Sequence, residues 1–345
     1  SKLYAVVVML LLFVAAGSAQ AQQSYKVGEN LLRNPQWKKA EGKRLPDEWD
    51  RLVLRGQAKA TLEVNRDGVL HIVFNDTQYM DQARLKQQLT IERGKVYELS
   101  FNYKTGGDGA NLRADISMIG TGPLYHNSIN PPSQEWTRRK YLFHIPENAK
   151  DKALPEGEMV LMFQNRSIVP IWYRNPALRV TDLDPDQLDS YQPTARLQSV
   201  TSEDVMIMPG STAKYAQFVA SVTPESAAAD LHVEAKLFNS EKKSFDVQIV
   251  NGRVQVPIDH ITAGKSVVYL YVYRGQEKAS RTLVSFAKHD IERITEDMIP
   301  GDIDFSVHHH MINPKGEPFF PIGIYAGLAW NFSVNGLANA GFNTI

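Results

Sequence analysis

Short runs in which apolar and polar residues alternate restrict the fold of this chain more than any other feature of its sequence. Between positions 30 and 183 these runs are separated by Gly, Asn, Asp and Pro, and no helical periodicity competes with them. Successive side chains of a strand point to opposite faces, so alternation buries one face of each strand. The pattern predicts an antiparallel β-sandwich with strands at 69–74, 85–91, 97–104, 112–119, 138–145, 159–164 and 177–180.

A second β-rich stretch follows an acidic segment. Residues 181–189 carry several Asp and one Pro, which indicates a linker or an exposed edge. Between 195 and 288 the alternation returns, and Asn251-Gly252 between two runs predicts a tight hairpin because both residues tolerate positive φ. About seven strands in roughly ninety residues favour an immunoglobulin-like β-sandwich without its disulfide. The expected strands lie at 205–208, 215–222, 231–238, 245–250, 253–257, 266–273 and 280–287.

The first 21 residues have the pattern of a secretory signal peptide. Lys2 precedes an apolar run at 3–16, and residues 17–21 have the small-x-small form that signal peptidase cleaves, here after Ala21. The run is shorter than the about 20 apolar residues of a transmembrane helix. We therefore expect a secreted or periplasmic protein without a membrane partner after cleavage. Because the sequence begins with Ser1 rather than Met, we also expect it to be incomplete.

Composition removes several classes of function. The 38 Lys and Arg residues balance 38 Asp and Glu residues, whereas nucleic-acid-binding proteins carry a net basic field, so we expect no nucleic-acid partner. The absence of cysteine excludes disulfides, thiolate nucleophiles, cysteine zinc sites and iron–sulfur clusters. No Walker sequence and no Gly-x-Ser-x-Gly occurs. The sequence therefore indicates no cofactor.

The end of the chain changes character. After a polar connector at 289–312, a turn at 313–316 leads into a nearly continuous apolar run at 318–325, then a short helical segment at 334–340 that ends at Gly341. This order predicts that 313–345 begins a β/α repeat. In the connector, His308, His309 and His310 favour a strand over a metal site, because only the first and third would share a face.

Two parts of the sequence resemble families associated with carbohydrates. The segments Ile312-Asn-Pro-Lys-Gly-Glu-Pro-Phe-Phe-Pro-Ile-Gly-Ile-Tyr325 and 337–345 resemble the beginning of the (β/α)8 barrel of clan A glycoside hydrolases. The opening Asn30-Leu-Leu-Arg-Asn-Pro35 belongs to a set of motifs that resembles carbohydrate-binding modules of families 4, 9 and 22. The others lie at 46–49, 94–101, 135–137 and 171–178. This resemblance implies a galactose-binding-like jelly roll over residues 22–190.

The chain departs from these modules at their calcium site. Many of them have Phe-Glu after the opening Asn-Pro and Asp before the closing Asn, and carboxylates near these points help to hold a structural calcium. This sequence has Gln36-Trp-Lys38 and Arg174-Asn175 instead. Cations there repel a divalent ion that prefers carboxylate oxygens. We expect no metal site, and a melting temperature that EDTA leaves unchanged.

Strand parity selects candidate sugar-binding residues. A sugar site combines aromatic rings with planar polar groups. Leu99, Phe101 and Tyr103 share one face of their strand, and Glu98, Ser100 and Asn102 share the other. In the strand at 112–119, Arg113, Asp115 and Ser117 lie opposite the apolar set. The resemblance implies that both polar sets line one concave face, with Tyr79 and Tyr125 as stacking platforms. The resulting candidates are Tyr79, Asn102, Arg113, Asp115 and Tyr125.

The aromatic residues also have a structural interpretation. Trp49, Tyr103, Trp136 and Trp172 favour core or edge packing over ligand contact, because aromatic side chains dominate the cores of sandwiches. The polar faces, likewise, are what any half-buried sheet presents.

Catalysis is not expected from these residues. Glycoside hydrolysis requires two positioned carboxyl groups, and a whole barrel takes about 250 residues. The resemblance implies glutamates on the fourth and seventh barrel strands, which residues 313–345 do not reach. The sequence thus predicts the catalytically inactive, glycan-binding and spacer region of a secreted glycoside hydrolase, with a polysaccharide or oligosaccharide as partner. The alternative is a secreted or cell-surface structural or adhesion protein that binds no sugar.

Overall fold

The structure is a computed structural model, and it describes residues 25–54, 60–74, 82–107, 114–120, 124–146, 158–165, 167–223, 230–298, 304–305, 311–312 and 318–319. These residues are mainly β-strands, which confirms the class expected from the alternation. The expected signal peptide, the three consecutive histidines and nearly all of 313–345 lie outside the described residues. Within the described ranges, no helix is long and apolar enough to cross a membrane.

The chain forms two compact units. The first comprises residues 1–206 and 212–293, and the second comprises 207–211 and 294–345. In the second unit, η6 (Glu296–Met298) is followed by β19 (Asp304–Phe305), β20 (Met311–Ile312) and β21 (Pro318–Phe319), which form a small antiparallel sheet. β12 (Met206–Ile207) lies where the two units meet in the sequence. The remaining elements belong to the first unit.

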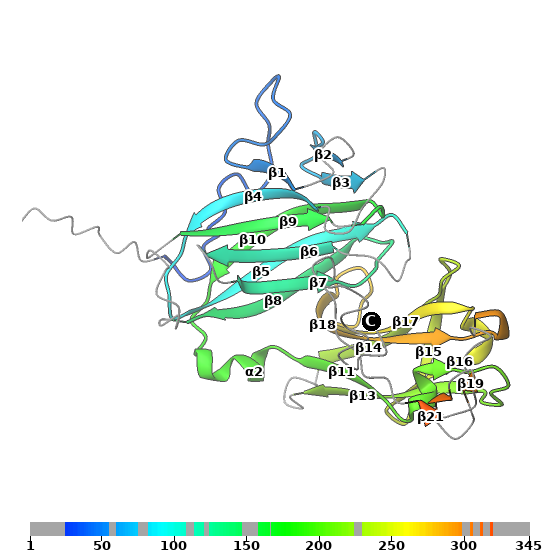
Figure 1. Ribbon diagram of the computed structural model, residues 1–345. Helices are drawn as coiled ribbons and strands as arrows, with labels where there is room; N and C mark the ends of the chain where they lie inside the picture. Colours follow the sequence, from blue (N-terminus) through cyan, green and yellow to red (C-terminus); the bar gives the residue numbers. More distant parts are fainter. Residues whose placement is uncertain are drawn as a thin grey trace, which may run out of the picture. The chain divides into compact units, whose positions relative to one another are not determined.

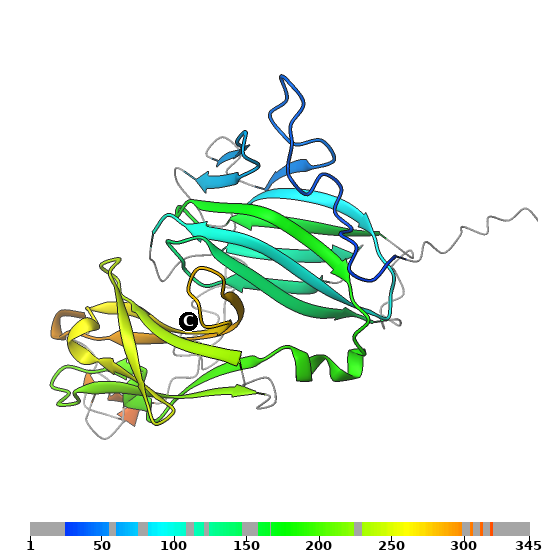
Figure 2. The ribbon, with the colours of Figure 1, turned by 180° about the vertical axis from the view of Figure 1, so that it is seen from behind.

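The first β-rich part consists of two layers of antiparallel strands (Figures 1 and 2). One layer is a five-stranded sheet in the order β1 (Asp50–Leu54), β4 (Gln82–Thr90), β9 (Glu158–Asn165), β6 (Ala114–Gly120) and β7 (Leu124–Asn130). The other layer is one end of a larger sheet, in the order β8 (Thr137–Ile145), β5 (Lys95–Thr105), β10 (Ile171–Val180), β3 (Leu70–Phe74) and β2 (Ala60–Val64).

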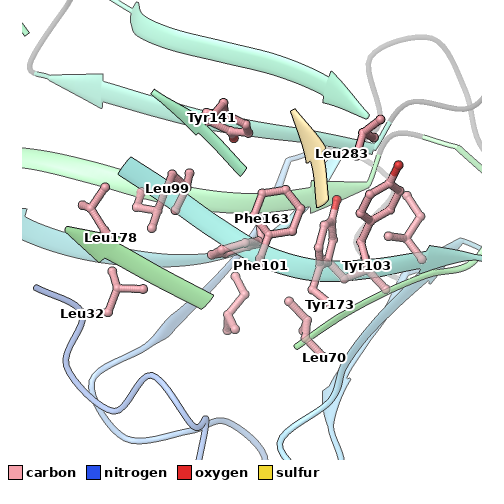
Figure 3. Close-up of a cluster of buried hydrophobic side chains, with 14 of the residues drawn as sticks. Leu32, Leu70, Leu99, Phe101, Tyr103, Tyr141, Phe163, Tyr173, Leu178 and Leu283 are labelled. Carbon is pink, nitrogen blue, oxygen red and sulfur yellow. The ribbon is translucent and has the colours of Figure 1, made fainter. Parts of the chain in front are cut away.

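Aromatic side chains join the two layers (Figure 3). The ring of Phe163 on β9 meets Phe101 on β5 and Tyr173 on β10, with centroids 5.7 and 5.3 Å apart. Leu99, Phe101 and Tyr103 are buried on the inner face of β5, as the parity predicts. Full burial of one such side chain is worth about 1.5–3 kcal/mol, so this layer contact holds the sandwich together.

The second β-rich part continues the larger sheet. Its strand order is β11 (Thr194–Ser199), β13 (Tyr215–Thr223), β16 (Arg253–Pro257), β15 (Ser244–Val250), β14 (Leu231–Phe238), β17 (Gly264–Arg274) and β18 (Thr282–Arg293). Residues 244–247 of β15 pair with β14, whereas 248–250 pair with β16. β15 therefore pairs with β14 along its first half and with β16 along its second half.

Short helical turns connect these elements. The acidic segment expected to be a linker contains η2 (Pro185–Gln187) and α2 (Leu188–Tyr191), and the Asp184 carboxylate accepts a hydrogen bond from the Asp186 amide at 3.0 Å. Further 3-10 turns are η3 (Ser202–Asp204) and η5 (Ile258–His260). The proline and the cap explain why the helix begins here, since both fit a helix N-terminus.

The two β-rich parts share a core within the first unit. β8 pairs with β18 in parallel through Arg139 and Leu283, and Arg139 Nη1 donates to the Leu283 carbonyl at 2.9 Å. Alternate residues of β17, namely Tyr269, Tyr271 and Tyr273, are buried in the same cluster as the inner face of the first sandwich. The sheet and its core thus continue from one part into the other.

Candidate functional site

A cavity of about 540 Å³ lies over the outer face of β8, β5 and β10. One wall comes from residues 132–138, which precede and begin β8, and the other from β14, β17 and the loop before β18. Of the residues expected to bind sugar, Asn102 lines this cavity. A concave site of this size is within the range of small-ligand pockets, about 300–1,000 Å³.

The floor of the cavity is a row of three polar side chains. In the sheet register, Asn102 on β5 lies opposite Arg138 on β8 and opposite Arg174 on β10. Directly opposed residues of antiparallel strands share a face, with Cβ atoms about 4.5–5.5 Å apart. An amide is therefore flanked by two guanidinium groups, and all three line the cavity.

Trp136 covers one end of this row. Its ring lies 4.0 Å from the guanidinium carbon of Arg174 and 5.3 Å from Nζ of Lys104. Lys104 also lies 4.7 Å from the ring of Trp172, which stacks on His71 with centroids 4.9 Å apart. Such cation–π contacts are worth about 0.5–1 kcal/mol at exposed sites, so they orient the side chains more than they stabilise the fold.

Two buried tyrosines hold the backbone that presents Trp136. Tyr103 of β5 donates its hydroxyl proton to the Pro131 carbonyl at 2.9 Å, and Tyr271 of β17 donates to the Pro132 carbonyl at 3.0 Å. Burial raises the pKa of Tyr103 well above its ordinary value, so the phenol stays protonated and continues to donate. The 131–136 segment is thereby fixed from both β-rich parts.

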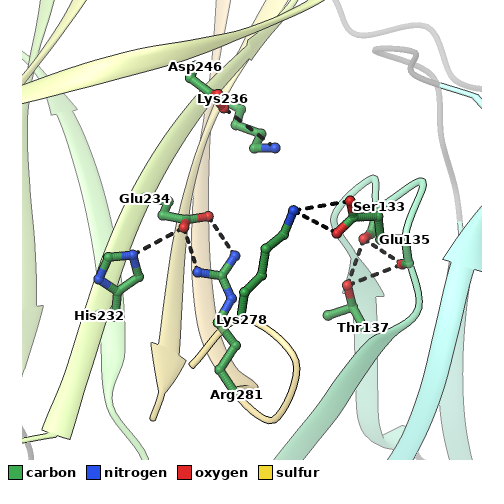
Figure 4. Close-up of polar contacts among 9 residues, drawn as sticks. All are labelled: Ser133, Glu135, Thr137, His232, Glu234, Lys236, Asp246, Lys278 and Arg281. Carbon is green, nitrogen blue, oxygen red and sulfur yellow. Dashed lines mark hydrogen bonds and ion pairs between the residues drawn. The ribbon is translucent and has the colours of Figure 1, made fainter. Parts of the chain in front are cut away.

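Ion pairs neutralise the cations of the opposite wall (Figure 4). Arg281 binds Glu234 through two contacts of 2.5 and 2.9 Å, and its guanidinium carbon lies 3.8 Å from the ring of Tyr273. Burial acts to raise the pKa of Glu234, but hydrogen bonds and charge from Arg281 lower it overall. Lys278 pairs with Glu135 of the 131–136 segment, with Nζ to Oε2 at 2.9 Å.

The arginines of the floor differ from those of the wall. Within the part of the chain that the structure describes, neither Arg138 nor Arg174 forms an ion pair or a hydrogen bond through its side chain. The Nε atom of Arg174 is buried and has no hydrogen-bond partner. A buried donor without an acceptor is costly, about 1–3 kcal/mol. The floor of the cavity therefore offers unused donors.

Of the other predicted sugar-binding residues, two lie in the five-stranded sheet. Tyr79 and Arg113 are outside the described residues. Asp115 lies in β6 and Tyr125 in β7, both in the five-stranded sheet. The expectation that the polar sets around Asn102 and Asp115 line one face is wrong, because the chain crosses to the other layer between β5 and β6. Contact of these residues with sugar stays a prediction.

Asp115 belongs to a second polar row. It lies opposite Gln164 of β9, and Gln164 lies opposite Arg84 of β4. Gln164 is fully buried and Arg84 is half-buried. The backbone register thus brings an acidic, an amide and a basic residue to one level of the five-stranded sheet.

Three residues that shape the cavity floor and its rim were not among the predicted sugar-binding residues. Trp136 was assigned to packing, but it is half-buried and lines the cavity. Arg138 occupies an outward position of its predicted strand, so the alternation identifies it as accessible. Arg174 precedes the predicted strand at 177–180 and is separated from it by a β-bulge, so the alternation did not place it. By contrast, Trp49 and Tyr103 are buried, which confirms the packing interpretation for both.

The positions that hold calcium in similar modules do not fit a metal here. The Asn34 amide donates to the carbonyls of Lys38 and Asp47, and its Oδ1 accepts from the Lys38 amide at 3.0 Å. Trp37 is fully buried, and Arg174 turns toward Trp136. Because the oxygen atoms are engaged and a cation stands at the closing position, these residues are poor ligands for a hard divalent ion.

Comparison with known proteins gives only distant similarities. No protein-family model matches the chain, and no curated protein matches it. A solved structure described as CBM4 is 15% identical, covers 45% of this chain and 100% of its own, and has a TM-score of 0.33. The module TmCBM61 in complex with β-1,4-galactotriose is 11% identical over 44% of this chain and 99% of its own, with a TM-score of 0.30.

A protein of another description aligns to a similar extent. A cyclase from Fischerella sp. TAU is 10% identical over 44% of this chain and 96% of its own, with a TM-score of 0.35. Similarities at this level assign no function, because one fold hosts many functions. The function of this chain must therefore be argued from its own residues.

Proposed function

We propose that residues 22–190 form a glycan-binding jelly roll and that residues 195–288 form an immunoglobulin-like spacer. Because residues 312–345 resemble the beginning of a (β/α)8 barrel, the jelly roll and the spacer would precede the catalytic barrel of a secreted glycoside hydrolase. The observation that carries glycan binding is the cavity, in which Trp136 stands beside Asn102 and Arg174. Pyranose rings place apolar faces on aromatic rings and donate or accept hydrogen bonds at their hydroxyls, for which amides and guanidinium groups are suited.

Binding without hydrolysis fits the cavity best. Among the described residues that line it, Glu135 supplies the one carboxylate, and this carboxylate is paired with Lys278. Hydrolysis of a glycosidic bond requires two carboxyl groups, one on each side of the bond. The pairing with Lys278 lowers the pKa of Glu135, which disfavours the protonated form that a general acid needs. We therefore expect no glycosidase activity from this site.

Substitution of Trp136 tests the proposal. Isothermal titration calorimetry of the full chain against a panel of soluble polysaccharides should identify a bound glycan, and Trp136→Ala should weaken its binding at least about tenfold, or 1.4 kcal/mol. Tyr215→Ala is the matched control, because Tyr215 is 45% exposed on β13 and does not line the cavity. Equal affinity of the Trp136→Ala variant and the wild type would place the glycan elsewhere.

Structural support is the second candidate function, and the shared core favours it. Tyr271 and Tyr273 bury their rings in the cluster that fills the first sandwich, and Lys278 pairs with Glu135 across the same junction. These contacts serve a rigid support whether or not sugar binds. If no polysaccharide in the panel binds the full chain, support is the better account.

A further inference from the structure

We propose that the glycan bound in this cavity is acidic, and that its carboxylate or sulfate group binds between Arg138 and Arg174. The inference rests on the proposed glycan binding and adds the class of ligand. Both side chains line the cavity and flank Asn102 in the register of the sheet. An oxyanion at this place would accept hydrogen bonds from two planar guanidinium forks.

The cavity has more basic side chains than acidic partners for them. Five basic residues line it, and three of them have acidic partners: Lys236 lies 3.5 Å from Asp246, Lys278 pairs with Glu135, and Arg281 pairs with Glu234. The two arginines of the floor have none among the described residues. Because the whole chain has equal numbers of acidic and basic residues, this local excess is not a consequence of its composition.

Arg174 is held in a position from which it can bind an anion. Its guanidinium lies over Trp136 at 4.0 Å, and a guanidinium in face contact with a ring keeps the N–H groups at its edge available. Its terminal N–H groups form no hydrogen bond or ion pair with any described residue that lines the cavity, so an oxyanion in the cavity would supply the acceptor that they lack. Trp136 therefore orients the guanidinium group of Arg174.

The spacing of Arg138 and Arg174 allows both side chains to contact one anion. They stand on β8 and β10, which flank β5, so their backbones are about 10 Å apart at a strand spacing of about 4.8 Å. Both side chains are long enough to converge above Asn102. Two like charges held near one another repel, and an anion between them removes that repulsion. Asn102 would then contact a neighbouring hydroxyl of the sugar.

The test uses matched polymers with and without charge. Calorimetric titration of the full chain should compare polygalacturonate with its carboxyl-reduced form, and a sulfated galactan with its desulfated form. We expect at least one acidic polymer to bind at least tenfold more tightly than its uncharged counterpart, and the difference to shrink at high salt because ionic contacts are screened. The preferred acidic polymer distinguishes a carboxylate from a sulfate ligand.

Substitutions locate the anion. Arg138→Gln and Arg174→Gln should each weaken binding of the acidic polymer at least tenfold more than binding of its neutral form. Arg196→Gln on β11 is the control, because Arg196 is exposed and outside the cavity. Should loss of the Trp136 contact destabilise the Arg174 variant, the exposed position of Arg138 leaves an independent test.

Each outcome decides between the two proposals. Equal binding of acidic and neutral polymers, with unchanged affinity in both variants, would overturn the acidic ligand and leave glycan binding intact. Equal weakening by Arg196→Gln would show general charge attraction and also overturn it. Failure of every polymer to bind would reject the glycan-binding function itself.

Discussion

Two ion pairs near the cavity differ in burial, and burial determines how much an ion pair contributes to stability. Arg281 and Glu234 have side chains that are 10% and 29% exposed, whereas Lys278 and Glu135 are 69% and 70% exposed. Exposed pairs contribute little because water and salt screen them. Removal of one partner from a buried pair leaves a desolvated charge without compensation. The first pair should therefore matter to stability and the second should not.

Neutralising Glu234 should destabilise the protein. Glu234→Gln leaves the guanidinium of Arg281 partly buried with weaker acceptors, so we expect a loss of about 1–3 kcal/mol in the free energy of unfolding at pH 7, measured with urea. Glu135→Gln is the matched control and should leave the urea midpoint unchanged. Equal effects of the two substitutions would contradict the difference in burial.

The effect of Glu234 should depend on pH. Its pKa in the folded protein is lowered, so its carboxylate stabilises the fold above the unfolded value of about 4.3, and this stabilisation is lost as pH falls through the folded pKa. The gap in unfolding free energy between the wild type and Glu234→Gln should shrink as the pH falls below about 4.3. A gap that grows as the pH falls below about 4.3 would contradict this sign.

At the scale of elements, the strands that sequence analysis missed share a position in the sheets. β1 and β7 are the two edges of the five-stranded sheet, and β2 and β11 are the two ends of the larger sheet. An edge strand has a neighbour on one side only. β2 and β11 nevertheless alternate in burial along their length.

The hairpin between β15 and β16 was predicted from two residues. Val250 pairs with Arg253, so Asn251 and Gly252 form the whole loop, and both have positive φ, +52° and +73°. Non-glycine residues pay about 1–2 kcal/mol in this region of backbone space. The loop needs this conformation because its twist matches that of the paired strands.

Replacement of Gly252 should measure the free-energy cost of positive φ for a residue with a side chain. A Cβ at Gly252 would meet no atom within 4 Å, so Gly252→Ala should lower the free energy of unfolding by about 1–2 kcal/mol through backbone strain alone. Gly107→Ala is the control, since a Cβ there also meets no atom within 4 Å and its φ is not positive. Thermal melts followed by circular dichroism measure both. Equal melting temperatures of the two variants would argue against the turn.

At the scale of the whole molecule, the shared core should couple the two β-rich parts of the first unit. Tyr269 lies on β17 in the second part, is 2% exposed, and belongs to the cluster that includes Phe101 and Phe163. Loss of a buried aromatic side chain costs about 3–5 kcal/mol. Because the cluster is continuous, the substitution of one of these side chains should destabilise both parts.

Tryptophan fluorescence can measure this coupling. Four of the five tryptophans, Trp37, Trp49, Trp136 and Trp172, lie in the first part, so in a Trp330→Phe background the fluorescence reports the unfolding of that part. We expect Tyr269→Ala to lower the fluorescence midpoint and the circular dichroism midpoint in urea by the same amount. An unchanged fluorescence midpoint would show that the parts unfold independently. Tyr191→Ala, at an exposed position of α2, controls for loss of a tyrosine.

The sequence by itself determined which side of each interior strand is buried. Period-two alternation is a local property, so the burial of Leu99, Phe101 and Tyr103 follows from a few neighbouring residues. Only the tertiary structure decided which strands are neighbours and in what register. That step places Asn102 between Arg138 and Arg174, and it assigns Asp115 to the other layer. Strand pairing joins residues far apart in the chain and depends on the packing of every layer at once, which no local pattern contains.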